Sequence, residues 1–150
     1  MIAEILCVGT ELLMGQVLNT NAQFLSRRLA ALGVSQYHQS CVGDNPGRLA
    51  DALHTLGVSK VFLSLGAQGV WADDGREGAL IPCVPGAIVN TSGCGDAFVA
   101  AAADACMRNL GTMDCARRGL AAAAICAEDP APVSPKMSAE AIEMRLNSAI

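Results

Sequence analysis

The chain has 150 residues, of which 52% are hydrophobic and 16% are charged, with a net charge of −4 and a pI near 5.0. The length predicts one domain, and the composition predicts a folded, globular chain rather than a disordered one. The negative net charge argues against a surface that binds nucleic acid or an anionic membrane. The longest apolar runs are too short to span a bilayer, and the first residues lack the pattern of a secretion signal.

The seven cysteines are an odd number and include no Cys-x-x-Cys pair and no histidine nearby at metal-ligand spacing. We therefore predict no metal site. We also predict reduced, mostly buried thiols and a cytoplasmic location. The cysteines lie at positions 7, 41, 83, 94, 106, 115 and 126.

In the first part of the chain, sequence patterns typical of β-strands alternate with patterns typical of α-helices. The apolar run 2–8 ends at Gly9, which is typical of a buried strand followed by a turn, and 21–32 has apolar residues at helical spacing before Gly33. The alternation continues with strands at 34–42 and 60–65 and a helix at 48–56. This order predicts a three-layer, Rossmann-like α/β domain with a mainly parallel sheet, and we expect one domain over 1–150.

The segment after the first strand carries the motif Gly9-Thr10-Glu11, followed by Asn19-Thr20-Asn21 and 42–45. With these motifs, 1–54 resembles the N-terminus of the competence-damage-inducible (CinA-like) proteins, which belong with the molybdopterin-binding MoaB/Mog fold. The resemblance implies a molybdopterin or nucleotide site at Gly9, Thr10 and Glu11. The same residues also fit a strand-to-helix turn in which Thr10 is a local cap.

The third strand leads into Gly66 and Gly69, and a hairpin is expected over 70–72 and 79–81. Asp73 and Asp74 lie in its polar turn. They fit either a metal pair or, as is more common beside glycine, residues that form the turn.

A glycine loop over 89–98 opens a helix near Gly95. Two glycines around one small residue allow close approach of a ligand, and the first N–H groups of a helix are unpaired and suit an anion. Asp96 follows in the first turn, where a carboxylate can take a proton from a hydroxyl that attacks phosphorus. The residues alone favour a plainer interpretation, in which Thr91 or Ser92 caps an Ala-rich helix.

This loop resembles the Thr-x-Gly-Ala-Gly-Asp signature of ribokinase-like (PfkB) carbohydrate and nucleoside kinases, and 55–150 is most similar to their pseudouridine-kinase branch. The resemblance implies that Asp96 is the catalytic base and that Gly93, Cys94 and Gly95 form the anion hole. It also implies Mg-ATP as donor and a sugar or nucleoside as acceptor. In many members an aspartate beside a monovalent-cation site occupies the position of Asn90. Because of this replacement, whether the chain binds a monovalent cation stays an open question. Further nucleotide contacts are implied for Ser64, Gly66, Gly69 and Thr91.

The remaining segments predict helices at 97–109 and 113–127, the second capped by Thr112. A proline-stiffened loop at 129–135 precedes a last helix that is capped by Ser138 and ends near 148.

The two resemblances meet near 53–56, so the chain reads as a chimera. The strand at Lys60 is expected to extend the sheet begun by 2–8 and 34–42, and an uncovered edge at the join would favour a homo-oligomer. Because the substrate half of the kinase is missing, phosphoryl transfer is expected to be impaired. The alternatives are a CinA-like binding domain and a chimeric fold without activity.

Overall fold

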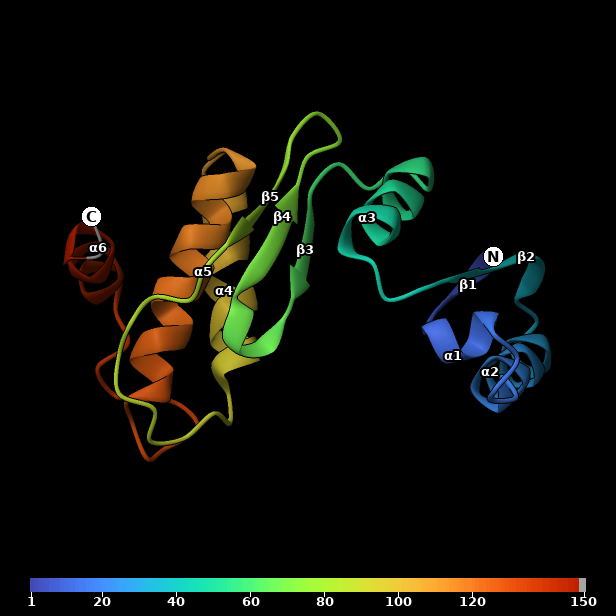
Figure 1. Cartoon of the computed structure of the whole chain (residues 1–150), viewed down its shortest axis with the longest axis horizontal. Helices are drawn as coiled ribbons and strands as arrows, with labels where there is room; N and C mark the ends of the chain where they lie inside the picture. Colours follow the sequence, from blue (N-terminus) through green and yellow to red (C-terminus); the bar gives the residue numbers. More distant parts are fainter. Residues whose placement is uncertain (149–150) are drawn as a thin grey trace. The chain divides into compact units, whose positions relative to one another are not determined.

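The computed structural model of the chain describes residues 1–148. Backbone contacts divide the chain into two compact units, unit 1 (Met1–Gly57) and unit 2 (Val58–Ile150). Each unit has its own sheet and its own helices (Figure 1). The division between the units lies close to 53–56, where the two family resemblances meet. The single-domain interpretation stays a prediction.

Unit 1 contains a two-stranded parallel sheet with helices packed on it. Strands β1 and β2 pair in parallel and are connected by α2, as the β-α-β pattern predicts. Asn19 caps α2 by accepting a hydrogen bond from the amide of Ala22 at 3.1 Å, so this helix begins at a satisfied end. The elements are β1 (Ile2–Val8), α1 (Thr10–Leu13), α2 (Thr20–Ala31), β2 (Ser35–Val42) and α3 (Pro46–Thr55).

Unit 2 begins with a three-stranded antiparallel sheet in the order β3-β4-β5. The hairpin β4–β5 is confirmed, and Asp74 shapes its turn by accepting from the amides of Arg76 and Glu77 at 2.9 and 3.0 Å. Asp73 accepts from the amide of Gly75 at 2.8 Å, as the turn interpretation predicts. The elements are β3 (Val61–Ser64), the 3-10 helix η1 (Gly66–Gln68), β4 (Val70–Asp73) and β5 (Gly78–Ile81).

The expected extension of the first sheet by the strand at Lys60 is wrong. In the described residues, β3 is hydrogen-bonded to β4 and belongs to a separate sheet from β1 and β2. A short strand pairs most readily with the strand that follows it after a tight connection, because a short loop costs little closure entropy. Residues 1–148 therefore contain one parallel and one antiparallel sheet.

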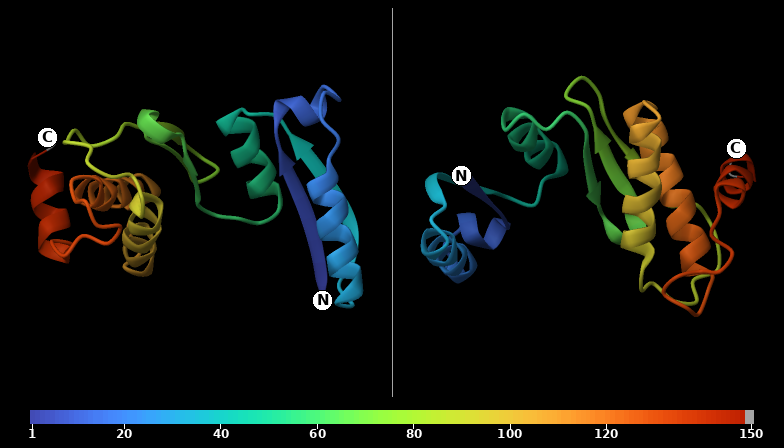
Figure 2. Two further views of the ribbon diagram at one scale, coloured as in Figure 1. Left: turned by 90° about the horizontal axis from the view of Figure 1, so that it is seen from below. Right: turned by 180° about the vertical axis from the view of Figure 1, so that it is seen from behind.

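Three helices complete unit 2, namely α4 (Cys94–Met107), α5 (Thr112–Ala127) and α6 (Ala139–Ser148). Helices α4 and α5 lie side by side between the sheet and α6 (Figure 2). Their alanines and Gly119 allow this close packing, and the Phe98 ring packs edge-on against Phe62 with centroids 6.1 Å apart. The core against the sheet consists of Val70, Ala72, Ala116 and Leu120.

Two expectations are wrong in the described residues: the cap of α5 and the burial of the cysteines. Thr112 is the first residue of α5 and buried, while Gly111 occupies the cap position without a side-chain hydrogen bond, so Thr112 is not the cap. Ser138 does cap α6, accepting from the amide of Ala141 at 3.1 Å. All seven cysteines are free thiols, but only Cys115 and Cys126 are buried, so the expectation of mostly buried thiols is wrong.

The expected α/β class, with a parallel sheet, a short hairpin and Ala-rich C-terminal helices, is confirmed. No helix within residues 1–148 is both long and apolar enough to cross a membrane.

Candidate functional site

The glycine loop enters α4 through a conformation that only glycine adopts readily. Gly93 is the N-cap of α4 with φ 81° and ψ −9°, in the left-handed region. No side chain caps this helix, so the interpretation in which Thr91 or Ser92 is the cap is wrong. A Cβ atom added at Gly93 would overlap the carbonyl oxygen of Pro132. Both observations require glycine here, because a side chain would be strained by the backbone and would clash with the neighbouring loop.

The first turn of α4 leaves backbone donors unpaired. The amide of Ala97 closes the first helical hydrogen bond to the Gly93 carbonyl at 2.9 Å, and the amide of Cys94 makes a long bond to Thr91 at 3.4 Å. Within the part of the chain that the structure describes, the amides of Gly95 and Asp96 have no acceptor. Two N–H donors at the positive end of a 14-residue helix form a site suited to an anion.

Asp96 lies in the same turn with its carboxylate exposed. This carboxylate makes no hydrogen bond or ion pair with any residue in the range 1–148. Nothing lies within 4 Å of a Cβ atom added at Gly95, so the space beside the turn is open. An exposed carboxylate next to two unpaired amides can accept a proton while the amides hold negative charge.

Cys94 supports the loop through its side chain. Its Sγ atom lies 3.8 Å from the carbonyl oxygen of Asn90, and burial, followed by the neighbouring Cys126 thiol, raises the pKa of Cys94. The Cys126 thiol donates to the Pro132 carbonyl at 3.2 Å. Because its pKa is raised, Cys94 is a protonated thiol that packs in the loop and not a nucleophile.

Two residues that the sequence analysis did not assign to the site hold its loops together. The Asn90 side chain donates to the Pro130 carbonyl at 2.9 Å and accepts from the amide of Ser92 at 3.0 Å. Asp129 is buried and accepts from the amide of Ala131 at 2.9 Å. In both cases an Asn or Asp side chain accepts from the amide two residues later, a local pattern that is visible in the sequence.

The other residues implied for nucleotide binding occupy the turn around η1. Gly66 begins η1 and its carbonyl oxygen lies 3.5 Å from Cys83 Sγ, while Gly69 follows η1 with φ 112°. A Cβ atom added at Gly69 would overlap the carbonyl oxygen of Ile81. Ser64 is the last residue of β3, and this strand ends at the same end of unit 2 at which α4 begins (Figure 1). Gly69 also accepts from the amide of Leu65 at 2.8 Å and donates to the Gly66 carbonyl at 3.2 Å, and Ser64 pairs with Val70 of β4. Of the four residues implied for nucleotide binding, Thr91 belongs to the glycine loop and the other three to the η1 turn.

Gly9, Thr10 and Glu11 lie in unit 1. The amide of Thr10 donates to Asp44 Oδ2 at 3.0 Å, and the amide of Asp44 donates back to Thr10 Oγ1 at 3.0 Å. Glu11 is close to Gly9, since a Cβ atom added at Gly9 would be 2.5 Å from Glu11 Oε1. These bonds join residues 34 apart in the sequence and link the segment after β1 to the segment after β2. Gly9 is the N-cap of α1 without a side-chain hydrogen bond, so the interpretation of Thr10 as a local cap is wrong. Two of the polar groups at this candidate site are already paired.

No group of three His, Cys, Asp or Glu side chains within residues 1–148 could hold a metal ion.

Comparison with known proteins connects this geometry to one family. A sequence profile of the pfkB family of carbohydrate kinases matches residues 27–139, more than half of the chain. The structure of ribokinase from Thermotoga maritima is similar to this chain with a TM-score of 0.61 and 29% identity, covering 67% of this chain and 34% of that protein. Ribokinase from Arabidopsis thaliana, solved in complex with ribose and ATP, has a TM-score of 0.59 and 29% identity over 67% of this chain and 33% of that protein.

The chain also resembles a second group. A CinA-like protein from Trichodesmium erythraeum is 51% identical over 75 residues, which are 49% of this chain and 18% of that protein. The chain therefore spans less than a fifth of the length of the curated relatives it matches and about a third of the solved kinases. The stretch that matches the pfkB profile, 27–139, and the 75 residues that match the CinA-like protein are together longer than the chain of 150 residues. The two matches therefore overlap.

These matches confirm the predicted likeness to both families and the kinase-type fold. The family match begins at residue 27, earlier in the chain than the portion 55–150 in which the kinase signature was found. It includes the sheet of unit 2, the glycine loop and helices α4 and α5. The chain belongs to the pfkB family of carbohydrate kinases.

Proposed function

We propose that this chain provides the phosphate-binding part of an ATP-dependent carbohydrate or nucleoside kinase. The observation that carries the proposal is the first turn of α4, where the unpaired amides of Gly95 and Asp96 lie beside the exposed Asp96 carboxylate. Gly93, whose conformation and close approach to Pro132 require glycine, holds these groups in place. Membership in the pfkB family supports the assignment of phosphoryl transfer to this turn.

In this proposal the acceptor hydroxyl attacks the γ-phosphorus of ATP while its proton passes to Asp96. A new oxygen–phosphorus bond forms, the bond from the γ-phosphorus to the bridging oxygen breaks, and ADP leaves with the electron pair. The amides at 93–96 donate to the oxygens of the transferred group, where negative charge accumulates. Thr91 and the residues of the η1 turn, Ser64, Gly66 and Gly69, are proposed to contact the nucleotide.

Mg²⁺ is expected to arrive with the triphosphate. Its usual ligands in such sites are phosphate oxygens and water with one or two carboxylates, so a cage of protein ligands is not required. When bound, it neutralises charge on the phosphates.

The acceptor is a small molecule with a free hydroxyl group. A sugar or a nucleoside fits the family, and pseudouridine is the first acceptor to test, because 55–150 resembles the pseudouridine-kinase branch. The chain spans about a third of the solved kinases. Acceptor positioning contributes much of the rate of phosphoryl transfer, so we expect slow turnover and use ATP binding as the first measurement.

The test is calorimetric titration of the chain with Mg-ATP, repeated on Gly95→Pro and Gly95→Ala. Proline removes one amide at a position in the first helical turn where it is tolerated. Alanine keeps the amide, and its Cβ meets no atom within 4 Å. We expect saturable binding to the parent and to Gly95→Ala, and roughly tenfold weaker binding to Gly95→Pro, because a hydrogen bond to a charged group is lost.

Circular dichroism must show that both variants keep the helical content of the parent. Equal affinity of the two variants would overturn the assignment of the phosphate site to this turn. No binding of Mg-ATP to the folded parent would favour the alternative of a fold without activity.

A second candidate is a nucleotide- or molybdopterin-binding domain of the CinA type at Gly9, Thr10 and Glu11. The identity of 51% over 75 residues to a CinA-like protein favours it. Titration with inorganic pyrophosphate tests this candidate. Binding that is weakened by Gly9→Ala and not by Gly95→Pro would support it.

A further inference from the structure

Unit 2 contains a cavity that the kinase proposal does not use. Its volume is about 300 Å³, and it lies among α4, α5 and α6. Residues from all three helices form its apolar wall. This volume is at the lower end of the range for pockets that bind small molecules. Members of the apolar wall include Ala97, Ala100, Ala101, Ala122, Met137 and Ile142.

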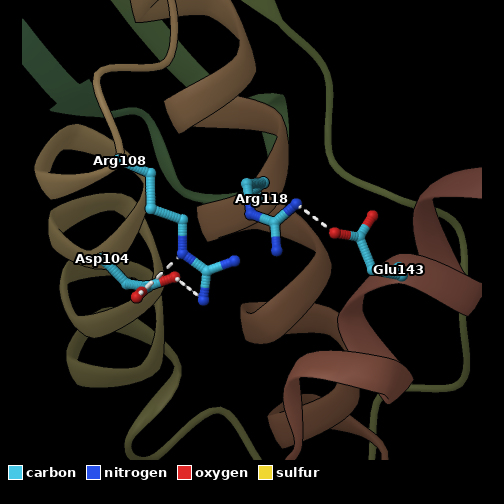
Figure 3. Close-up of polar contacts among 4 residues, drawn as sticks. All are labelled: Asp104, Arg108, Arg118 and Glu143. Carbon is cyan, nitrogen blue, oxygen red and sulfur yellow. Dashed lines mark hydrogen bonds and ion pairs between the residues drawn. The ribbon is translucent and has the colours of Figure 1, made fainter.

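Two arginines bring positive charge to this cavity. Arg118 of α5 is only 8% exposed, and its Nη1 donates to Glu143 Oε1 of α6 at 2.6 Å. Arg108, the residue that directly follows α4, binds Asp104 with two nitrogens, Nε at 3.2 Å and Nη2 at 3.0 Å. Figure 3 shows both guanidinium groups between the two carboxylates that they bind. Each carboxylate restrains the rotation of its arginine.

Neither guanidinium group is fully paired. Arg108 Nη1 and the Nε and Nη2 atoms of Arg118 have no acceptor within residues 1–148. The Arg108 side chain is 52% exposed, and the unpaired nitrogens of Arg118 are not fully buried atoms, so these N–H groups are within reach of water or a ligand. The planar donor fork of arginine matches the oxygens of a carboxylate or a phosphate.

We propose that this cavity is a second ligand site, which binds a small organic anion. Its carboxylate or phosphate group accepts hydrogen bonds from Arg108 and Arg118, and its apolar body packs on the alanines of α4 and α5. The restrained guanidinium groups lower the ordering cost of binding. The loop 93–96 does not line the cavity, so the site is separate from the proposed phosphate site. Ala97 does line it and directly follows Asp96, so an occupant would contact the turn that carries the proposed base.

The test is a titration of the isotope-labelled chain followed by ¹H–¹⁵N NMR, which resolves backbone amides and arginine Nε–H groups. The probes are hexanoate and hexyl phosphate, with hexanol and inorganic phosphate as the matched neutral and head-only compounds. We expect saturable shifts at Arg108, Arg118 and the lining residues with both organic anions. We expect at least roughly tenfold weaker binding of hexanol and of inorganic phosphate, because each lacks one half of the interaction. The tighter of the two organic anions identifies the head group.

Two pairs of variants locate the binding site. Arg108→Gln is expected to weaken hexanoate binding about tenfold, whereas Arg117→Gln, an exposed arginine paired with Asp114 outside the cavity, should not change it. Ala100→Leu should reduce binding by filling the cavity, and Ala103→Leu, at an exposed position of α4 that does not line the cavity, should not.

Three outcomes would overturn the proposal. The first is no saturable shift at the lining residues with either organic anion. The second is equal binding of hexanol and hexanoate, which would show an apolar cavity without anion recognition. The third is a set of shifts spread over surface lysines and arginines, which would show an adventitious ion only.

Discussion

The two units form their predicted elements equally well but differ in how much apolar surface they bury. In unit 1 the buried apolar side chains are Ala22 and Ala50, whereas Phe24 and Tyr37 are 62% and 80% exposed. Unit 2 buries larger side chains against its sheet, Val70 and Leu120 among them. Burial stabilises by about 25 cal/mol per Å² of apolar surface, so unit 2 has the larger stabilising core.

This difference shows that a correct pattern of helices and strands does not ensure a core. The helix α2 of unit 1 has apolar residues at regular spacing, yet Leu25 remains 47% exposed. In unit 2, the small residues of α4 and α5 let two helices approach closely and leave the larger side chains to fill the space against the sheet. The first four predictions below compare matched changes in the two units.

The largest effect is expected for catalysis, which the proposal assigns to unit 2. Asp96→Asn should lower the rate of ADP formation from Mg-ATP and acceptor by about 10²- to 10⁴-fold, the usual contribution of a general base. Glu11→Gln in unit 1 should leave the rate unchanged.

Asp114→Asn is the matched control, since Asp114 also lies in the first turn of a helix and is exposed. Both Asp→Asn changes should lower the free energy of unfolding by no more than ~1 kcal/mol, the usual value for a helix-terminal charge. An unchanged rate in Asp96→Asn would remove Asp96 as the base. An equal loss in Glu11→Gln would contradict the division of function between the units.

The second prediction concerns the core. Leu120 is 5% exposed and belongs to the cluster on the sheet, so Leu120→Ala should lower the free energy of unfolding by about 2–5 kcal/mol. Leu25→Ala in unit 1 should cost less than about 1 kcal/mol, because this side chain is half exposed. Both changes in the free energy of unfolding are measured by urea unfolding, followed by circular dichroism and by the fluorescence of Trp71, the single tryptophan. Equal losses would mean that the units are equally well packed.

The third prediction uses the same change in a helix of each unit. At Gly119 of α5, an added Cβ would lie 2.5 Å from the Phe98 ring, so Gly119→Ala should destabilise by about 1–3 kcal/mol. At Gly47 of α3, the nearest atom is Asn45 Oδ1 at 3.5 Å, so Gly47→Ala should stabilise by up to about 1 kcal/mol through helix propensity. Thermal unfolding gives the sign of each change. A stabilising effect of Gly119→Ala would show that α4 and α5 can move apart at little cost.

The smallest effect is chemical. Burial, and then a hydrogen bond with Cys106, raises the pKa of Cys115 from 9.0 to about 11. Cys115 of unit 2 should therefore react with iodoacetamide at pH 8 far more slowly than the exposed Cys41 of unit 1, because the thiolate is the reactive form. Peptide mass spectrometry measures both, with the urea-unfolded chain as the control in which the two rates converge. Equal rates in the folded chain would contradict the burial of Cys115.

The same shift has a consequence for the dependence of stability on pH. The protonated thiol is favoured in the folded chain, so its contribution to the free energy of unfolding is complete below pH 9. This contribution is lost as the pH rises from 9 through 11. The loss should be smaller in Cys115→Ala, which has no thiol to ionise.

Features that depend on neighbouring residues were predicted well. Ser138 caps α6, and the hairpin turn at 73–78 is shaped by Asp73 and Asp74. Each of these depends on one or two side chains that act on backbone groups a few residues away, and their chemistry is therefore visible in the order of residues. The roles of Asn90 and Asp129 in the loops belong to the same class and could have been predicted.

The sequence by itself thus determined most of the elements, the Ser138 cap of α6, the hairpin turn and the position of the glycine loop. Only the tertiary structure decided which strand pairs with β3, which amides of the loop remain unpaired, and how Arg118 meets Glu143 to border a cavity. Arg118 and Glu143 are 25 residues apart, and their meeting depends on how α5 and α6 pack. Periodicity and local hydrogen bonding act within a few residues, whereas strand pairing and side-chain burial depend on contacts between distant segments, which no local pattern records.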